Sequence, residues 1–103
     1  MVVQHHSQRS EARESVEVEL FGVPRLLAGQ RSLVVTGRTL GEIVTALATS
    51  CPALRGPVIE ETSGWLHPGY TFVVDERFTR DATIPVSPRD TVLLVASAAG
   101  GRA

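Results

Sequence analysis

The sequence predicts one α+β domain in which a single main helix packs across one face of a mixed sheet of four to five strands. Three observations support this fold class. Hydrophobic residues alternate over residues 16–21, recur at helical spacing over residues 40–51, and run almost without interruption over residues 92–96. A chain of 103 residues has room for one such domain with one core.

Residues 1–14 are rich in Gln, Ser, Arg and Glu and show no periodicity, which predicts a disordered lead-in. The adjacent His5 and His6 in this segment have no fixed geometry, so no metal site is expected there. We therefore place the folded domain at residues 15–97 and a flexible tail at residues 98–103.

The first strand is predicted to have one buried face and one exposed face. Its alternation places Val16, Val18 and Leu20 on one face, which is apolar. The other face, formed by Glu17, Glu19 and Phe21, is mostly charged. Phe21 is the aromatic exception on the charged face, which makes it a candidate contact for a partner. A second strand is predicted at residues 32–35, so that the two strands form a hairpin with a long connection.

The main helix is predicted to begin after Thr39 and to stop before Pro52. Thr39 and Glu42 have the spacing of a capping box, in which the Glu42 carboxylate reaches back to the amide of Thr39. One apolar stripe follows at helical spacing, formed by Leu40, Ile43, Val44, Leu47, Ala48 and Cys51. Because Cys51 completes this stripe, we expect a buried structural thiol rather than a reactive one.

The next segment is irregular, because Pro and Gly interrupt residues 53–70. His67, in this segment, is expected to be a solvated loop residue rather than a catalytic one. A third strand is predicted at residues 71–74, followed by a polar turn at Asp75 and Glu76 that leads to Phe78.

The last strand is predicted at residues 91–96, after a turn at residues 85–90. Since it is nearly all apolar, we expect it to lie centrally in the sheet, with the first strand as its neighbour.

The composition excludes several classes of function. A net charge of −1 gives no indication of nucleic-acid or membrane binding. The single cysteine, Cys51, excludes an internal disulfide and cannot hold a metal alone. No apolar run is long enough to span a membrane and no secretory signal is present, so we expect a cytoplasmic protein with no bound cofactor. The adjacent acids Asp75 and Glu76 form no catalytic set with a base and a nucleophile, which argues against an enzyme.

The tail after the last predicted strand consists of small residues. No side chain is larger than a methyl group in Ala98, Ala99, Gly100 and Gly101, after which come Arg102 and Ala103. Such an arm is thin enough to enter a narrow channel in a partner and to present a carboxylate there. The alternative is a frayed terminus without function.

Taken in order, these features resemble the MoaD/ThiS family of ubiquitin-like sulfur carriers, which have the β-grasp fold. The resemblance covers about residues 16–101. It consists of short matches at Val18-Glu19-Leu20-Phe21-Gly22, Arg25, Ala28-Gly29, Thr39-Leu40, Pro52-Ala53-Leu54, Val73-Val74-Asp75, Arg89-Asp90 and Gly100-Gly101. Each match is short, and the specificity lies in their order over the whole domain.

The resemblance implies a carrier rather than an enzyme. In this family an E1-like enzyme uses ATP to adenylate the terminal glycine carboxylate, and a sulfur donor converts the adenylate to a thiocarboxylate for a sulfur-accepting synthase. It implies an acyl site at Gly101, a thin arm of Gly100, Ala99 and Ala98, and a partner-binding patch of Phe21, Phe78 and Val95. The sulfur would enter cofactor, amino-acid or specialised-metabolite biosynthesis. A small-subunit role in a molybdopterin-synthase-like complex is also compatible with the resemblance.

One departure from the family concerns the residues after the second glycine. Active carriers end at that glycine, whereas here Arg102 and Ala103 follow. The resemblance therefore implies a precursor that a metalloprotease trims between Gly101 and Arg102. Two alternatives stay open, namely a non-catalytic β-grasp interaction module and a tag that is joined to other proteins through Gly101. For Phe78, packing under the neighbouring loop is the alternative to a place in the patch.

Overall fold

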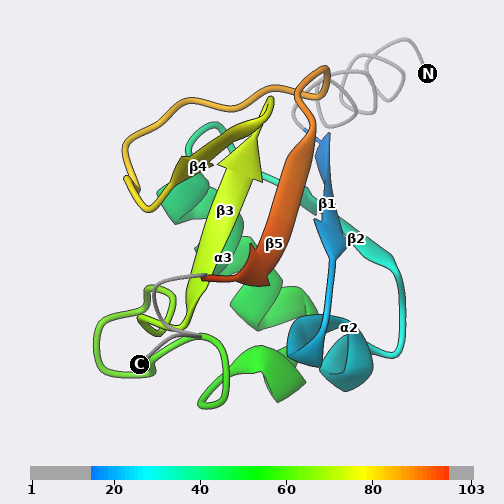
Figure 1. The fold of residues 1–103 in the computed structure, drawn as a ribbon, viewed down its shortest axis with the longest axis vertical. Coiled ribbons are helices and arrows are strands. Elements are labelled where there is room, and N and C mark those ends of the chain that lie inside the picture. The colour runs from blue at the N-terminus through cyan, green and yellow to red at the C-terminus, as the bar shows by residue number, and fades with distance from the viewer. Residues whose placement is uncertain (1–14, 98–103) are drawn as a thin grey trace, which may run out of the picture.

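A five-stranded mixed sheet with the order β2-β1-β5-β3-β4 forms one layer of the fold in the computed structural model, which describes residues 15–97. The strands are β1 (Ser15–Leu20), β2 (Ser32–Thr36), β3 (Tyr70–Val74), β4 (Arg77–Thr79) and β5 (Val92–Ala96). The main helix α3 (Leu40–Ser50) packs behind this sheet in the view of Figure 1. The predicted fold class is therefore confirmed. The lead-in and the tail, predicted at residues 1–14 and 98–103, lie outside the described residues.

The central strand β5 pairs with the first strand and with the third. β1 and β5 are parallel, with Leu20 opposite Leu94, whereas β3 and β5 are antiparallel. The amide of Phe21 extends the parallel pairing by donating to the carbonyl of Leu94 at 3.2 Å. Both predictions for the last strand, its central position and its neighbour, are confirmed. A strand flanked on both sides and covered on one face by α3 is expected to be apolar, as β5 is.

The core lies between the sheet and α3. It consists largely of fully buried side chains from alternate strand positions and from the helix stripe, including Val16, Val18, Leu20, Phe72, Val92, Leu94, Leu40, Ile43, Val44 and Leu47. The irregular segment also contributes to the core through Leu54, Val58, Ile59 and Leu66, although it has no periodic pattern. Cys51 is half-buried at the C-terminal end of α3, so its thiol is less enclosed than predicted.

The N-terminus of α3 is capped as the sequence predicts. The Thr39 hydroxyl accepts a hydrogen bond from the amide of Glu42 at 3.3 Å. The Glu42 carboxylate accepts from the amide of Arg38 at 2.8 Å, so its contact lies one residue earlier than predicted. A side-chain cap of this kind satisfies amides that have no partner within the helix.

The loop after β4 completes this cap with backbone groups. The carbonyls of Ala82 and Ile84 accept hydrogen bonds from the amides of Gly41 at 2.9 Å and Leu40 at 3.0 Å. The close approach suits a glycine, since a Cβ on Gly41 would lie 3.3 Å from the Ala82 carbonyl oxygen. The long loop between β4 and β5 is therefore tied to the start of the helix.

The connection between β1 and β2 contains a helix that the sequence analysis missed. The helix α2 spans Val23–Ala28, begins with Pro24 in its first turn, and is followed by Gly29 at φ 68°. Proline fixes a helical φ at the first turn, and glycine accepts the left-handed conformation that ends a helix. Because α2 has only six residues, its hydrophobic pattern is too short to be read as a helical period.

His67 lies in a loop with its side chain 38% exposed, as predicted, but its ring also has contacts that the sequence does not show. Its side chain is half-buried, and Nε2 lies 2.6 Å from the carbonyl oxygen of Gly56. The other ring nitrogen, Nδ1, lies 3.5 Å from a carboxylate oxygen of Glu60. His67 thus joins the two ends of the irregular segment, a role that requires contacts between residues distant in sequence.

Among residues 15–97, no helix has both the length and the apolar character needed to cross a membrane.

Candidate functional site

The chain leaves the sheet beside residue 69. At the end of β5, Ala96 pairs with Tyr70, and the amide of Ser97 donates to the carbonyl of Gly69 at 2.7 Å. Ser97 is therefore held by the segment that precedes β3. The predicted acyl site Gly101, with Gly100, Ala99, Ala98 and Arg102, lies outside the described residues, so these assignments stay predictions.

The side chain of Arg80 holds that same segment from the other edge. Its guanidinium donates to the carbonyls of Leu66 and His67, each at 3.1 Å, and to the carbonyl of Tyr70. The ladder between β3 and β4 begins only at Phe72, which leaves the carbonyl of Tyr70 without a strand partner on this side. Arg80 takes the place of that partner, since a guanidinium presents several donors in one plane. No local pattern in the sequence points to Arg80, because the carbonyls it binds lie 10 to 14 residues away.

The outer face of the sheet, opposite α3, carries a row of apolar side chains. Val73 pairs with Phe78 on one side and with Leu93 on the other. Paired residues project to the same side of a sheet, and their neighbours Phe72 and Leu94 are fully buried on the α3 side. Val73, Phe78 and Leu93 therefore point outward. Phe78 is 70% exposed, so it does not pack under the neighbouring loop, and its role in a partner-binding patch stays a prediction.

A second row lies nearer the point at which the chain leaves the sheet. Val95 pairs with Thr71 and is half-buried. Phe21 follows the inward-pointing Leu20 and lies beside Val95 in the parallel register, and it is 37% exposed. We call Phe21, Val73, Phe78, Leu93 and Val95 together the outer apolar face.

Acidic residues border the outer apolar face on β1. Glu19 lies opposite Leu93, and Glu17 accepts a hydrogen bond from the hydroxyl of Ser32 at 2.8 Å. An apolar surface with a polar border is typical of protein-binding surfaces. The structure thus brings together the three residues predicted for the patch, Phe21, Phe78 and Val95, and adds Val73 and Leu93. Strict alternation along β3 and β5 is the signal that would have identified the two additional residues.

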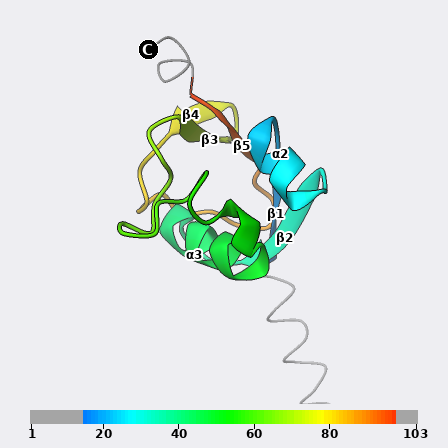
Figure 2. The same cartoon turned by 90° about the horizontal axis from the view of Figure 1, so that it is seen from below.

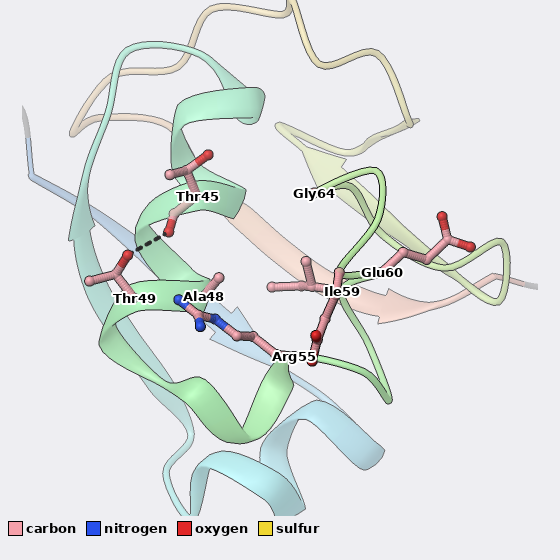
Figure 3. Close-up of a pocket in the computed structure, with 8 residues that line it drawn as sticks. Thr45, Ala48, Thr49, Arg55, Ile59, Glu60 and Gly64 are labelled. Carbon is pink, nitrogen blue, oxygen red and sulfur yellow. Dashed lines mark hydrogen bonds between the residues drawn. The ribbon is translucent and has the colours of Figure 1, made fainter.

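The opposite side of the molecule has an open hollow of about 310 Å³ between α3 and the irregular segment (Figure 3). Its lining consists of Thr45, Ala48, Thr49, Arg55, Ile59, Glu60, Glu61 and Gly64. The Thr49 hydroxyl is engaged with the carbonyl of Thr45 at 3.1 Å. This lining contains no nucleophile paired with a base, and no group of three His, Cys, Asp or Glu side chains suited to a metal ion occurs within residues 15–97.

Asp81 has a shifted pKa for a structural reason. The hydroxyl and the amide of Thr83 donate to one oxygen of its carboxylate at 2.6 and 2.9 Å, and these bonds lower the pKa of Asp81 below its ordinary value. Hydrogen bonds to a carboxylate favour its charged form. Since this carboxylate orders the loop that caps α3, its shift reflects loop geometry and not a catalytic role.

The solved structures that are similar to this fold include two archaeal modifier proteins and a chain of a bacterial complex. The small archaeal modifier protein 1 (SAMP1) of Haloferax volcanii is 24% identical with a TM-score of 0.71, and the match covers 84% of this chain and 99% of that one. SAMP1 of Methanosarcina acetivorans is 20% identical with a TM-score of 0.73, over 86% and 98% of the two chains. A chain of the BexX/CysO complex of Amycolatopsis orientalis is 20% identical with a TM-score of 0.66, over 80% and 94%. These similarities establish the β-grasp fold.

The sequence comparison identifies the family. No curated protein matches the chain. The ThiS family matches residues 18–101, a range that ends at the second glycine of the tail. Members of this family are small carrier proteins rather than enzymes. The chain therefore belongs to the ThiS family of ubiquitin-like sulfur carriers.

Proposed function

We propose that this protein carries sulfur as a thiocarboxylate on Gly101. An E1-like enzyme would adenylate the carboxylate of Gly101 with ATP, and a sulfur donor would then convert the adenylate to a thiocarboxylate. A sulfur-accepting synthase would take this sulfur for the biosynthesis of a cofactor, an amino acid or a specialised metabolite. The observation that carries the proposal is the family match, which extends through Gly101.

The proposed activation takes place in two substitution steps. In the first step, the Gly101 carboxylate attacks the α-phosphorus of ATP, which forms an acyl adenylate and releases pyrophosphate. In the second step, a sulfur nucleophile from the donor replaces AMP at the acyl carbon, so that one carboxyl oxygen leaves with AMP. The adenylate is needed because a free carboxylate resists nucleophilic attack, whereas AMP is a good leaving group. ATP would act as a co-substrate of the activating enzyme, and no cofactor would reside on the carrier.

Processing is the step that must precede activation. An acyl adenylate forms only on a free carboxylate, and in this protein the carboxyl group of Gly101 is joined to Arg102. A protease, of the metalloprotease class by resemblance, would therefore cleave between Gly101 and Arg102. We place both this cleavage and the later activation in the cytoplasm.

The arrangement of the sheet supports the proposal. The central strand β5 leads directly to Ser97, which is anchored through Gly69. The outer apolar face begins two residues before Ser97, at Val95, and includes Phe21 beside it. A partner that holds this face would therefore be positioned to receive the residues after Ser97.

The proposal is tested with a chain that ends at Gly101, incubated with the purified E1-like enzyme of the source organism, ATP and sulfide. We expect release of pyrophosphate and an intact mass that increases by one oxygen-to-sulfur exchange. The matched controls are the same chain ending at Gly100 and the chain through Ala103, both of which are expected to stay unmodified. Circular dichroism checks that all three fold alike. Sulfur on the chain ending at Gly100, or none on the chain ending at Gly101 with an enzyme that activates a control carrier, would contradict the proposal.

A protein-conjugation tag is the second candidate. Two of the similar structures are described as small archaeal modifier proteins, which favours this function. A tag would form amide-linked species of higher mass that survive reducing agent, whereas a thiocarboxylate carrier would not. A non-catalytic interaction module is favoured only by the outer apolar face. It predicts that Phe21→Asp weakens a partner complex while removal of all residues after Ala99 leaves that complex unchanged.

A further inference from the structure

The helix α2 presents two apolar side chains to solvent. Leu26 is 80% exposed and Val23 is 45% exposed, and a spacing of three residues places them on the same side of a helix. The packing of α2 depends on other residues, because Pro24 is buried and Leu27 packs against the core. Single exposed apolar residues are common. Two such residues on one face of a helix, neither of which packs against the core, indicate a contact surface.

This pair lies at the end of the sheet from which the chain departs. β1 and β5 run parallel, so the end of β1, which leads into α2, is beside the end of β5, which leads to Ser97. Figure 2 views this end directly and places α2 next to β5. The exposed pair is thus joined to the outer apolar face through Phe21, which lies two residues before Val23.

The distance along the chain restricts which partner meets this surface. Gly101 follows Ser97 by four residues, which span at most about 14 Å when extended. A protein that acts on the Gly101 carboxyl must therefore bring its active site within that distance of Ser97. The body of such a protein is far larger than this gap, so its surface around the active site faces α2 and the end of the sheet.

The charges indicate the chemistry of the matching surface. Arg25 lies between Val23 and Leu26 in the sequence of α2 and is exposed. The acidic residues of β1, Glu17 and Glu19, lie farther from this end of the sheet. A complementary surface would combine an apolar pocket with carboxylates at its border.

We propose that Val23 and Leu26 form a second docking surface for the enzyme that adenylates Gly101, and that they fill an apolar pocket bordered by carboxylates. This inference rests on the proposed function. It adds α2 to the binding surface, whereas the sheet contributes the outer apolar face. Docking through α2 affects how well the carrier binds, and the adenylation step itself takes place at Gly101.

The test uses the chain ending at Gly101, the purified E1-like enzyme of the source organism and an assay of ATP–pyrophosphate exchange. The variant Val23→Thr/Leu26→Gln makes the face polar without a strong helix breaker. We expect its KM to rise about tenfold, the loss typical of an apolar contact in a pocket, with kcat unchanged. The matched control is Val34→Thr, which alters an apolar side chain of β2 that is 66% exposed, and its KM should stay at the wild-type value.

A second variant tests the charge. Arg25→Gln should raise KM and should also reduce the dependence of KM on salt concentration. The reason is that a charge at the border of an interface mainly changes the rate of association, which salt screens. If the wild-type chain is activated and the α2 variant has the same KM as the wild type, the docking inference is wrong and the proposed function stands. If the wild-type chain is not activated by an enzyme that adenylates a control carrier, both are wrong.

Discussion

The amide of Ser97 and the carbonyl of Gly69 lie 2.7 Å apart, and this hydrogen bond continues the pairing of β5 with β3 past the ends of the two strands. The carbonyls on either side of Gly69 in that segment, those of His67 and Tyr70, are bound by Arg80. The direction in which the chain departs from the sheet is thus determined by a segment that Arg80 holds in place.

The first prediction concerns this anchor. Arg80→Ala removes donors to three carbonyls, and we expect a loss of about 1 kcal/mol in the free energy of unfolding, as for partly solvated hydrogen bonds. The amide of Ser97 should also exchange its hydrogen faster than in the wild type. Urea unfolding and NMR hydrogen exchange measure the two effects. Arg77→Ala removes the same charge from β4 and is the control. An equal effect of both variants would show that the lost charge, and not the three lost hydrogen bonds of Arg80, lowers the free energy of unfolding.

The second prediction separates the two faces of β5. Leu94 is fully buried against α3, so Leu94→Ala should lower the free energy of unfolding by about 3 kcal/mol through lost burial and a residual cavity. Leu93 is half-buried on the outer apolar face, and Leu93→Ala should cost about 1 kcal/mol. Urea unfolding at constant pH compares the two variants. Equal costs would contradict the assignment of the faces.

The third prediction uses the pKa of Asp81. Thr83→Val keeps the amide donor and removes the hydroxyl, which is the larger cause of the lowered pKa. We expect the pKa of Asp81 to rise toward its ordinary value without reaching it. A carboxylate whose folded pKa is lowered stabilises the protein above its unfolded pKa, and this contribution is lost as the pH falls through the folded pKa. In the variant, the loss should therefore begin at a higher pH. An NMR titration of the carboxyl carbon reports the shift, and an unchanged pKa would refute the stated cause.

The fourth prediction concerns the turn between β3 and β4. Asp75 and Glu76 both have positive φ, at 49° and 74°, a conformation that favours glycine. Glu76→Gly should raise the free energy of unfolding by about 1 kcal/mol because it removes the steric cost of a left-handed residue. Asp75 differs, since its carboxylate accepts from the amide of Thr91 at 2.9 Å. Asp75→Gly should therefore gain less than Glu76→Gly, and thermal unfolding of both variants tests that order.

Much of the fold follows from local patterns that the sequence contains. The alternation of β1, the stripe of α3 with its Thr39 cap and the apolar β5 each depend on neighbours within a few residues, so they were predicted close to their observed bounds. The family resemblance placed Phe21, Phe78 and Val95, and the register confirms that the three point to one side of the sheet.

Other features depend on contacts between distant residues. Arg80 binds carbonyls 10 to 14 residues away, and His67 meets a carbonyl 11 residues away, so neither has a local signal. The helix α2 is too short for its period to appear, and the exposure of Leu26 depends on which side of α2 packs against the core. These features require the tertiary structure, because a one-dimensional pattern does not show which groups lack a partner.

The parallel pairing of β1 with β5 has a consequence for synthesis on the ribosome. The central strand is the last of the five to be made, so the β1–β2 pair and the β3–β4 pair cannot join into one sheet before Ala96 has left the exit tunnel. Until then, the apolar faces of β1 and α3 lack the cover of the buried β5 side chains Val92 and Leu94 and are suitable targets for chaperones. Nascent chains that stall before β5 would therefore lack the complete sheet and be open to degradation. The complete domain forms only on chains whose synthesis has passed Ala96, the last residue of β5 before the proposed carrier tail.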